Sequence, residues 1–196
     1  MRFPLLLSAL LVASSALPAA RAEAGTLSRG DLAPPVLGES GGKQVLLTDY
    51  RGKVVVVTFW KVSCTPCKAQ MKAFEELNKQ YGPMGLQVIG VDLGDSAKDY
   101  GRMLREVRRP TMVMAHDEGA SVGEAWGVFM LPNVWVVDAD GRILAHHEGY
   151  VDSDLQGIFD EIRGILAARQ APMATPAAPA AAPSASAPAP AGGAPR

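Results

Sequence analysis

Hydrophobic residues in the middle of this chain follow two patterns, continuous runs and positions spaced three or four residues apart. Residues 54–60 form a continuous run that contains four consecutive valines, and residues 86–91 form a second apolar run. Such runs are typical of buried strands that are covered on both faces. Between them, apolar positions recur at helical spacing over residues 66–81, and Gly82 and Pro83 mark the end of that helix.

The rest of the central region continues this alternation of strand and helix. A turn at residues 138–141 joins the last two predicted strands as an antiparallel hairpin. We predict further strands at residues 45–47, 111–115, 134–137 and 143–147, helices at 97–107 and 121–126, and a last helix that Ser153 caps and that runs to about residue 169. This order predicts an α/β fold with a central mixed β-sheet flanked by helices.

The two ends of the chain differ in composition from the middle. Arg2 precedes an apolar stretch at residues 5–17, and small residues follow it, so we expect a secretory signal peptide at 1–22 with cleavage before Glu23. Residues 171–196 are almost entirely Ala, Pro, Ser and Gly, which predicts a disordered tail. Residues 23–170 have the length of one domain. The expected location is the periplasm, with an N-terminal membrane anchor if the signal is not cleaved.

The charge of the chain excludes some classes of partner. It carries 19 basic and 20 acidic residues, for a formal net charge of -1. A nucleic-acid-binding protein or one attracted to an anionic membrane surface normally has an excess of basic residues. We therefore expect no nucleic acid and no membrane surface as a partner.

The chain has two cysteines, Cys64 and Cys67, in the order Cys-Thr-Pro-Cys between the 54–60 run and the following helix. Free N–H groups and the helix dipole at a helix start stabilise a thiolate on the first cysteine. A second thiol three residues later can close a small disulfide ring. The motif therefore predicts a redox-active pair and no bound cofactor.

Other roles for two close cysteines stay open at this point. A structural zinc site needs further ligands, and the histidines, which are His116, His146 and His147, form no close pair of ligands with the motif. We expect no metal there. A structural disulfide across so short a loop would stabilise the fold weakly. A copper(I) carrier would use the same two soft thiolates, although no third ligand is evident.

Several ordered motifs give the chain a resemblance to a known family. They are Gly-Lys-Val-Val-Val-Val-Thr-Phe-Trp at 52–60, Cys-Thr-Pro-Cys-Lys at 64–68, Gly-Val at 127–128, Leu-Pro at 131–132 and Val-Val-Asp-Ala-Asp-Gly-Arg-Ile at 136–143. From about residue 32 to 166 the chain resembles exported TlpA/ResA-like thiol-disulfide oxidoreductases. The resemblance implies a thioredoxin-like fold with the extra strand–helix insertion of that group.

The resemblance also implies roles for individual residues. Cys64 is the exposed nucleophile, Cys67 is the buried resolving thiol and Pro132 is a cis-proline that faces them. A mixed disulfide on Cys64 is resolved by Cys67. Phe129 and Met130, in the loop before Pro132, could form an apolar substrate rim. We expect the rim of the active site to contain Trp60, Lys61, Ser63, Thr65, Pro66 and Leu131.

Three positions depart from the family pattern. Ser63 stands where a tryptophan usually precedes the first cysteine, so the surface around the nucleophile should be less apolar. Gln70 replaces a glutamate of the ResA branch, and Thr58 replaces the buried acid of thioredoxin. Neither side chain titrates, so we expect the proton of Cys67 to leave through water, a backbone-linked route or Lys61, with slower resolution of mixed disulfides.

The predicted function is reduction of disulfides in client proteins, in cytochrome c maturation or copper-site assembly, by a monomer that receives electrons from a membrane thiol reductase. A proline before the second cysteine accompanies thioredoxin-like potentials near about -270 mV, which favours a reductase. The alternatives are a disulfide oxidase or isomerase and the copper(I) carrier. The Pro-x-x-x-Thr-x-x-Cys pattern of a peroxiredoxin is absent.

Overall fold

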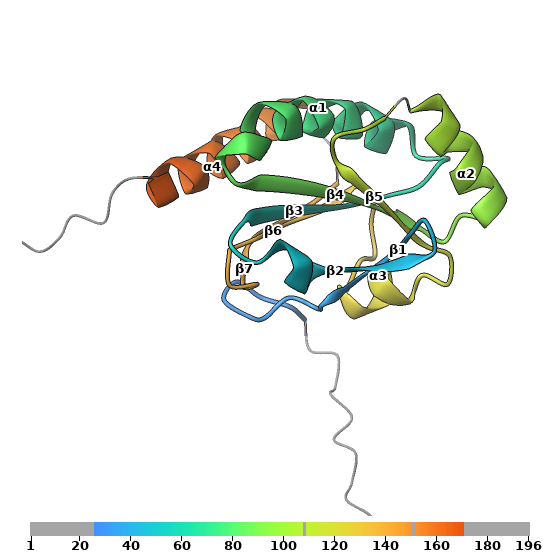
Figure 1. The fold of residues 1–196 in the computed structure, drawn as a ribbon, viewed down its shortest axis with the longest axis horizontal. Coiled ribbons are helices and arrows are strands. Elements are labelled where there is room, and N and C mark those ends of the chain that lie inside the picture. The colour runs from blue at the N-terminus through green and yellow to red at the C-terminus, as the bar shows by residue number, and fades with distance from the viewer. Residues whose placement is uncertain (1–25, 108, 150–151, 171–196) are drawn as a thin grey trace, which may run out of the picture.

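The computed structural model describes residues 26–107, 109–149 and 152–170 (Figure 1). The predicted signal peptide and the predicted Ala/Pro-rich tail lie outside the described residues. The sheet has seven strands in the order β2-β1-β5-β4-β3-β6-β7. The strands are β1 (Val36–Ser40), β2 (Lys43–Leu46), β3 (Val54–Trp60), β4 (Leu86–Leu93), β5 (Val113–Asp117), β6 (Asn133–Val137) and β7 (Ile143–Glu148).

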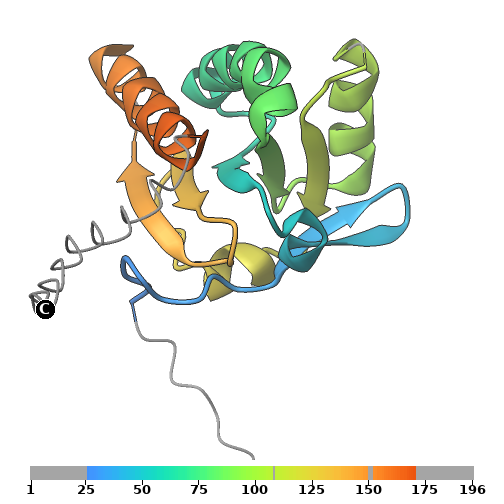
Figure 2. The ribbon, with the colours of Figure 1, turned by 60° about the vertical axis from the view of Figure 1, so that its left-hand side comes forward.

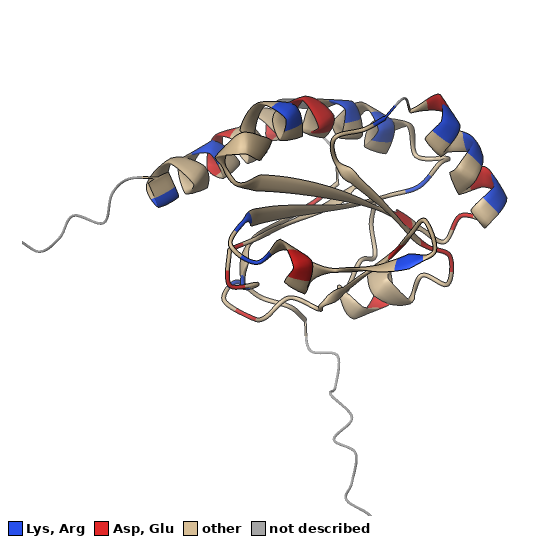
Figure 3. Cartoon of the chain, viewed as in Figure 1, with Lys and Arg blue, Asp and Glu red and all other residues tan. Residues whose placement is uncertain are grey.

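In the described part of the chain, four α-helices cover the sheet. They are α1 (Thr65–Tyr81), α2 (Ala97–Glu106), α3 (Ser121–Ala125) and α4 (Asp152–Gln170). Short 3-10 helices at Leu47–Tyr50 and Gly82–Met84 connect strands and helices. Figure 2 shows α1, α2 and α4 on one side of the sheet and α3 on the other. Figure 3 shows charged residues along α1, α2 and α4, whereas the central strands are mostly uncharged.

The centre of the sheet is parallel and its edges are antiparallel. β3, β4 and β5 run parallel to one another, and α1 and α2 connect them as two βαβ units. β6 pairs antiparallel with β3, β7 pairs antiparallel with β6, and β1 pairs antiparallel with β5. Every residue of β3 is buried, because this strand lies between two neighbours and beneath helices on both faces. This is the predicted mixed α/β sheet of a thioredoxin-like fold.

Two hydrophobic cores result from the two covered faces. The first lies under α1, α2 and α4 and includes Phe74, Tyr100 and Ile162. The second lies under α3 and the β1–β2 hairpin and contains Trp126 and Trp135, whose rings meet edge to face with centroids 5.6 Å apart. Both tryptophans are therefore core residues.

Several element boundaries differ from the predicted ones, and one strand was not predicted. Strand β2 starts at Lys43, two residues before its predicted start, and β4 ends at Leu93, two residues after its predicted end. Strand β5 starts at Val113, two residues after its predicted start, and α4 starts at Asp152, so Ser153 lies inside the helix and not at its cap. Strand β1 was not predicted. It contains few apolar residues, and Gly38, at φ +98°, comes so close to β5 that an added Cβ would lie 2.6 Å from the carbonyl oxygen of His116.

Candidate functional site

The two cysteines lie at the junction between the central strand and the first long helix. Strand β3 ends at Trp60, α1 starts at Thr65, and Cys64 is the N-cap residue of that helix. Cys64 and Cys67 are joined as a disulfide, with their Cα atoms 5.3 Å apart. Cys64 is half-buried, whereas Cys67 is completely buried. An incoming partner can therefore reach Cys64 more easily than Cys67.

The start of α1 provides electrostatic stabilisation for a thiolate on Cys64. The backbone N–H of Cys67 donates a hydrogen bond to Cys64 Sγ over 3.2 Å. Free N–H groups and the positive end of the helix dipole favour negative charge at this position. Pro66 lies in the first turn, where a missing N–H costs no helical hydrogen bond. When the disulfide is reduced, this geometry favours ionisation of Cys64.

The loop before β6 lies at the same end of the sheet. Asn133 pairs with Phe59, so the preceding residues reach the edge where β3 leads into Cys64. The Leu131–Pro132 peptide bond is cis, and Pro132 is buried. Leu131 is half-buried and packs against both cores, and Cys64 packs against the first core.

The exposed surface at this end is partly apolar. Phe129 and Met130, which precede Leu131 in the chain, have exposed fractions of 95% and 57%. Large apolar side chains at such exposure are available for contact with a partner. Ser63 and Thr65, next to Cys64, are also exposed.

Of the residues expected at the rim, Trp60 is placed differently by the structure. Its side chain is completely buried and belongs to the first core, because it is the last residue of β3 and points beneath the helices. Pro66 is exposed and Lys61 is half-buried. Trp60 is therefore a support beneath the site and not part of its surface.

The two uncharged positions noted in the sequence contact each other. The hydroxyl of Thr58 donates a hydrogen bond to Gln70 Oε1 over 3.2 Å, and both side chains are buried. This pair was not predicted from the sequence, because Thr58 lies on β3 and Gln70 on α1. Because Gln70 and Cys67 both lie on α1 one turn apart, this pair is a neutral, hydrogen-bonded environment near the buried sulfur.

A second group of polar residues lies beside the site and was missed by sequence reasoning. Asp92, near the end of β4, is completely buried, and burial together with the nearby Asp95 raises its pKa to about 8. Asp95 Oδ2 accepts a hydrogen bond from the backbone N–H of Val62 over 2.6 Å. The one signal in the sequence was an acidic residue at the carboxyl end of a predicted parallel strand, a place where sites often form.

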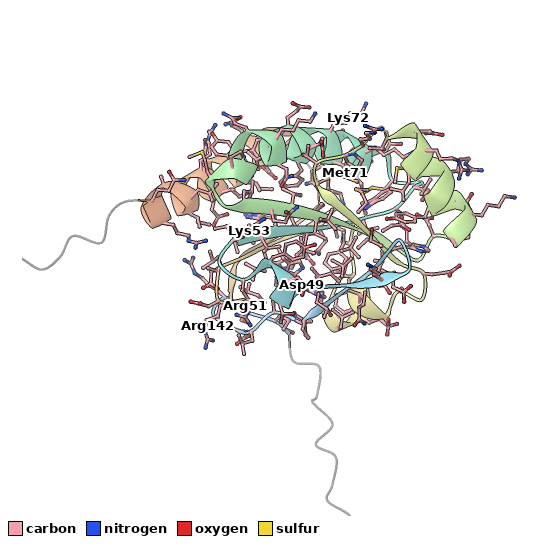
Figure 4. All side chains as sticks on the ribbon, in the orientation of Figure 1. Asp49, Arg51, Lys53, Met71, Lys72 and Arg142 are labelled. Atoms are coloured by element: carbon pink, nitrogen blue, oxygen red, sulfur yellow. A yellow bond between two sulfur atoms is a disulfide. The ribbon has the colours of Figure 1, made fainter. Side chains whose placement is uncertain are left out.

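A cavity of about 430 Å³ lies between α1 and α2 next to this end of the sheet. Its apolar lining includes Trp60, Val107, Pro110 and the methionines Met71, Met103, Met112 and Met114, and charged side chains of both signs surround it. Figure 4 labels Met71 and Lys72 on α1 among these residues. Methionine side chains are flexible, so the shape of this cavity can adjust.

The two histidines of β7 point to opposite faces of the sheet, because successive side chains alternate along a strand. The ring of His146 stacks on Trp135 with centroids 3.6 Å apart, whereas His147 Nε2 lies 2.8 Å from Glu161 Oε2 on α4. Among the described residues, no group of three or more His, Cys, Asp or Glu side chains could hold a metal ion. Within the same residues, no helix is both long and apolar enough to cross a membrane.

Comparison with known protein sequences gives consistent matches. A family model described as the AhpC/TSA family matches residues 30–146. The chain is 28% identical over 111 residues to the thiol-disulfide oxidoreductase ResA of Bacillus thuringiensis subsp. konkukian. This alignment covers 55% of the chain and 62% of the length of that ResA. It is 31% identical over 133 residues to the thiol:disulfide interchange protein HelX of Rhodobacter capsulatus, which is 66% of this chain and 73% of HelX.

Solved structures show the same fold. A protein of Chlorobium tepidum, assigned as the thiol:disulfide interchange protein DsbE, aligns with a TM-score of 0.67 and 27% identity over 71% of this chain and 99% of its own. A protein of Neisseria meningitidis assigned as a thioredoxin aligns with a TM-score of 0.59 and 23% identity, covering 70% of this chain and 92% of its own. The second likeness is evidence for the fold alone.

Proposed function

The chain belongs to the AhpC/TSA family and resembles its TlpA/ResA-like members, and from this we propose that it is a thiol-disulfide oxidoreductase that reduces disulfides in client proteins. The observation that supports this activity most directly is the asymmetric Cys64–Cys67 pair at the start of α1. Cys64 is half-buried at the helix start, where the helix would stabilise its thiolate after reduction, and Cys67, to which it is bonded, is completely buried.

The proposed reaction has two steps, each a thiol–disulfide exchange. The Cys64 thiolate attacks one sulfur of a client disulfide, a new S–S bond forms between them, and the other client sulfur leaves as a thiolate and takes up a proton. Cys67 then loses its proton and attacks Cys64 Sγ, which forms the Cys64–Cys67 disulfide and releases the second client thiolate. Two electrons pass from the protein to the client, and the described structure is the oxidised product.

The loop before β6 supports binding of an extended client segment. Pro132 has no N–H, and its neighbours lie at the edge of the site with the exposed side chains of Phe129 and Met130. Backbone groups at such an edge can pair with an extended peptide, while exposed apolar side chains contact its residues. We assign the positions beside the client disulfide to Leu131 and Pro132, with Lys61, Ser63, Thr65 and Pro66 on the opposite side.

The compartment, direction and partners are part of the same proposal. We assign the protein to the periplasm, where it would act as a monomer. A membrane thiol reductase would supply its electrons, and its redox-active disulfide would be its only redox group. Cytochrome c maturation and copper-site assembly are the processes in which its clients would be found. The proline between the cysteines supports a low reduction potential and therefore the reductase direction.

The test is the reduction potential of the Cys64/Cys67 couple together with turnover. The protein is equilibrated with glutathione or dithiothreitol buffers, free thiols are trapped, and reduction of a disulfide-bonded client is followed. A potential below about -200 mV with client reduction supports the proposal, whereas a value near about -120 mV identifies a thiol oxidant. Tight stoichiometric copper(I) binding without turnover would identify a carrier instead.

A further inference from the structure

Three residues lie side by side at the carboxyl ends of the parallel strands. Trp60 of β3 is in register with Asp92 of β4, and Asp92 is in register with His116 of β5. Residues in register on neighbouring parallel strands point to the same face of the sheet. Trp60 belongs to the core under α1 and α2, so the carboxyl group of Asp92 lies on that side, beneath the active-site helix.

The Asp92 carboxyl group lies in surroundings that oppose ionisation. Its side chain is completely buried, and neither oxygen accepts a hydrogen bond from any donor in the described part of the chain. A buried carboxylate without donors is strongly disfavoured relative to the neutral acid. A neutral carboxyl group, in contrast, carries a proton that it can donate.

Several titratable groups face Asp92 from the elements around it. His116 of β5 has Nε2 3.5 Å from Asp92 Oδ2, Tyr100 of α2 stacks on the His116 ring, and the Tyr100 hydroxyl has no partner among the described residues. The negative charges nearby are Asp95, in the loop after β4, and Asp117, at the end of β5, whereas Lys61 provides the nearby positive charge. Burial and Asp95 outweigh Lys61 and raise the pKa of Asp92 to about 8.

Asp95 connects this buried acid to the turn that carries Cys64. Its Oδ2 accepts the N–H of Val62 over 2.6 Å, and its backbone carbonyl accepts a hydrogen bond from His116 Nε2 over 2.8 Å. The N–H of Cys64 in turn donates to the carbonyl of Lys61 over 3.0 Å. The Asp95 side chain is therefore the anchor of a short turn at residues 61–64, and His116 fixes the backbone of that anchor.

From this geometry we propose that Asp92 is a positioning residue, whose protonated carboxyl group donates a hydrogen bond to Asp95 and so holds the 61–64 turn in place for attack by Cys64. The two acids lie close together, because His116 Nε2 is 2.8 Å from the backbone carbonyl oxygen of Asp95 and 3.5 Å from Asp92 Oδ2. Two neighbouring carboxylates cannot hydrogen-bond to each other, so a hydrogen bond between these side chains requires a proton on one of them. When Asp92 loses this proton, the two carboxylates repel each other, and the hydrogen bond from the Val62 N–H to Asp95 weakens. The role depends on the proposed function only in taking Cys64 as the attacking thiol.

The test measures the reactivity of Cys64 without any client. The full chain is reduced and freed of reductant, and alkylation of Cys64 by iodoacetamide is followed by peptide mass spectrometry from about pH 6 to pH 10. The thiolate fraction is measured separately by its ultraviolet absorbance, which gives a rate per thiolate. We expect this rate to fall by about two- to tenfold in the wild type as Asp92 ionises, as for the loss of a hydrogen bond.

The decisive variant is Asp92→Asn, because an amide keeps the shape and the donor and cannot ionise. Its rate per thiolate should stay constant over the same pH range. Asp95→Ala, which removes the anchor, should give the low rate at every pH. Glu106→Gln removes one exposed acidic charge of α2 and should behave like the wild type.

Each outcome can be read separately from the proposed function. The same fall in Asp92→Asn and wild type, or a constant rate in the wild type, overturns the role of Asp92 even if client disulfides are reduced normally. A Cys64 that never reacts at any pH contradicts the proposed function itself. If Asp92→Asn does not fold, the rate per thiolate of Asp95→Ala decides. A constant low rate in Asp95→Ala beside a falling rate in the wild type supports the proposal, and the same fall in both proteins overturns it.

Discussion

At the scale of single residues, the two sulfurs differ in exposure although they are three positions apart. Cys64 is half-buried at the N-cap, and Cys67 is buried in the first turn of α1. We therefore predict that Cys67→Ser traps client proteins as mixed disulfides on Cys64, because the second exchange step has lost its thiol. Non-reducing gels and mass spectrometry would detect these adducts.

The matched variant for this prediction is Cys64→Ser, which keeps Cys67. It should form few adducts, because the remaining thiol is buried and a buried thiol away from charge reacts slowly. Equal trapping by the two variants would show that the roles of the cysteines are not divided as proposed.

The Thr58–Gln70 hydrogen bond leads to a second prediction at the same scale. Gln70→Glu places a titratable group in the buried environment near Cys67. We expect faster resolution of a mixed disulfide because a carboxylate can accept the Cys67 proton, and a loss of about 1–3 kcal/mol in the free energy of unfolding because the charge is buried. Stopped-flow release of a fluorescent client thiol and urea unfolding measure the two effects.

Thr58→Val is the control for this prediction, because it breaks the same hydrogen bond without adding a base. It should destabilise the fold by about 1 kcal/mol and leave the resolution rate unchanged. If Gln70→Glu also leaves the rate unchanged, the proton of Cys67 leaves by a route that does not pass this position.

At the scale of elements, β3 and α1 could be predicted because their sequences are consistent at every level. The valines of β3 favour a strand and are buried on both faces, and α1 has regular apolar spacing after a proline in its first turn. The cysteines lie between these two elements, so their position followed from local sequence. The environment of Asp92 did not, because it depends on the register of three strands whose neighbouring residues, Trp60, Asp92 and His116, lie far apart in the chain.

Strand β1 shows the same limit for the fold. Its pairing with β5 depends on Gly38, which has φ +98° and no room for a Cβ against the carbonyl of His116. We predict that Gly38→Ala destabilises the protein by about 2–4 kcal/mol, because both the backbone conformation and the clash carry a cost. Urea unfolding at fixed pH would measure the change.

Gly41→Ala is the matched control for Gly38→Ala. Gly41 also has a positive φ, +57°, but an added Cβ would meet nothing within 4 Å. It should cost about 1 kcal/mol, which is the conformational part alone. Equal losses for the two variants would show that the close approach of β1 to β5 does not constrain this strand.

At the scale of the whole molecule, acids and bases that are partly or completely buried determine how the free energy of unfolding depends on pH. Burial alone would raise the pKa of Glu75, but the backbone N–H groups of Thr111 and Met112 donate to it and lower its pKa. The stability that ionised Glu75 contributes is therefore present above the pKa that this group has in the unfolded chain, and it is lost as the pH falls through the lower pKa of the folded protein. Burial lowers the pKa of His146, so its protonation at low pH also opposes folding.

Asp92 affects the pH dependence of stability in the opposite direction, and the last prediction concerns this effect. Its folded-state pKa of about 8 lies above the unfolded value of 3.8, so between these values the folded protein holds a proton that the unfolded chain has released. Stability attributable to Asp92 is therefore present at low pH and is lost as the pH rises through this range. The oxidised Asp92→Asn variant should gain stability over oxidised wild type by about 1 kcal/mol per pH unit between about pH 5 and pH 7. The two proteins share Glu75 and His146, so the difference between their free energies of unfolding in urea isolates the contribution of Asp92. Parallel pH profiles of the two proteins would contradict this prediction. They would show that the Asp92 carboxyl group ionises as freely in the folded protein as in the unfolded chain.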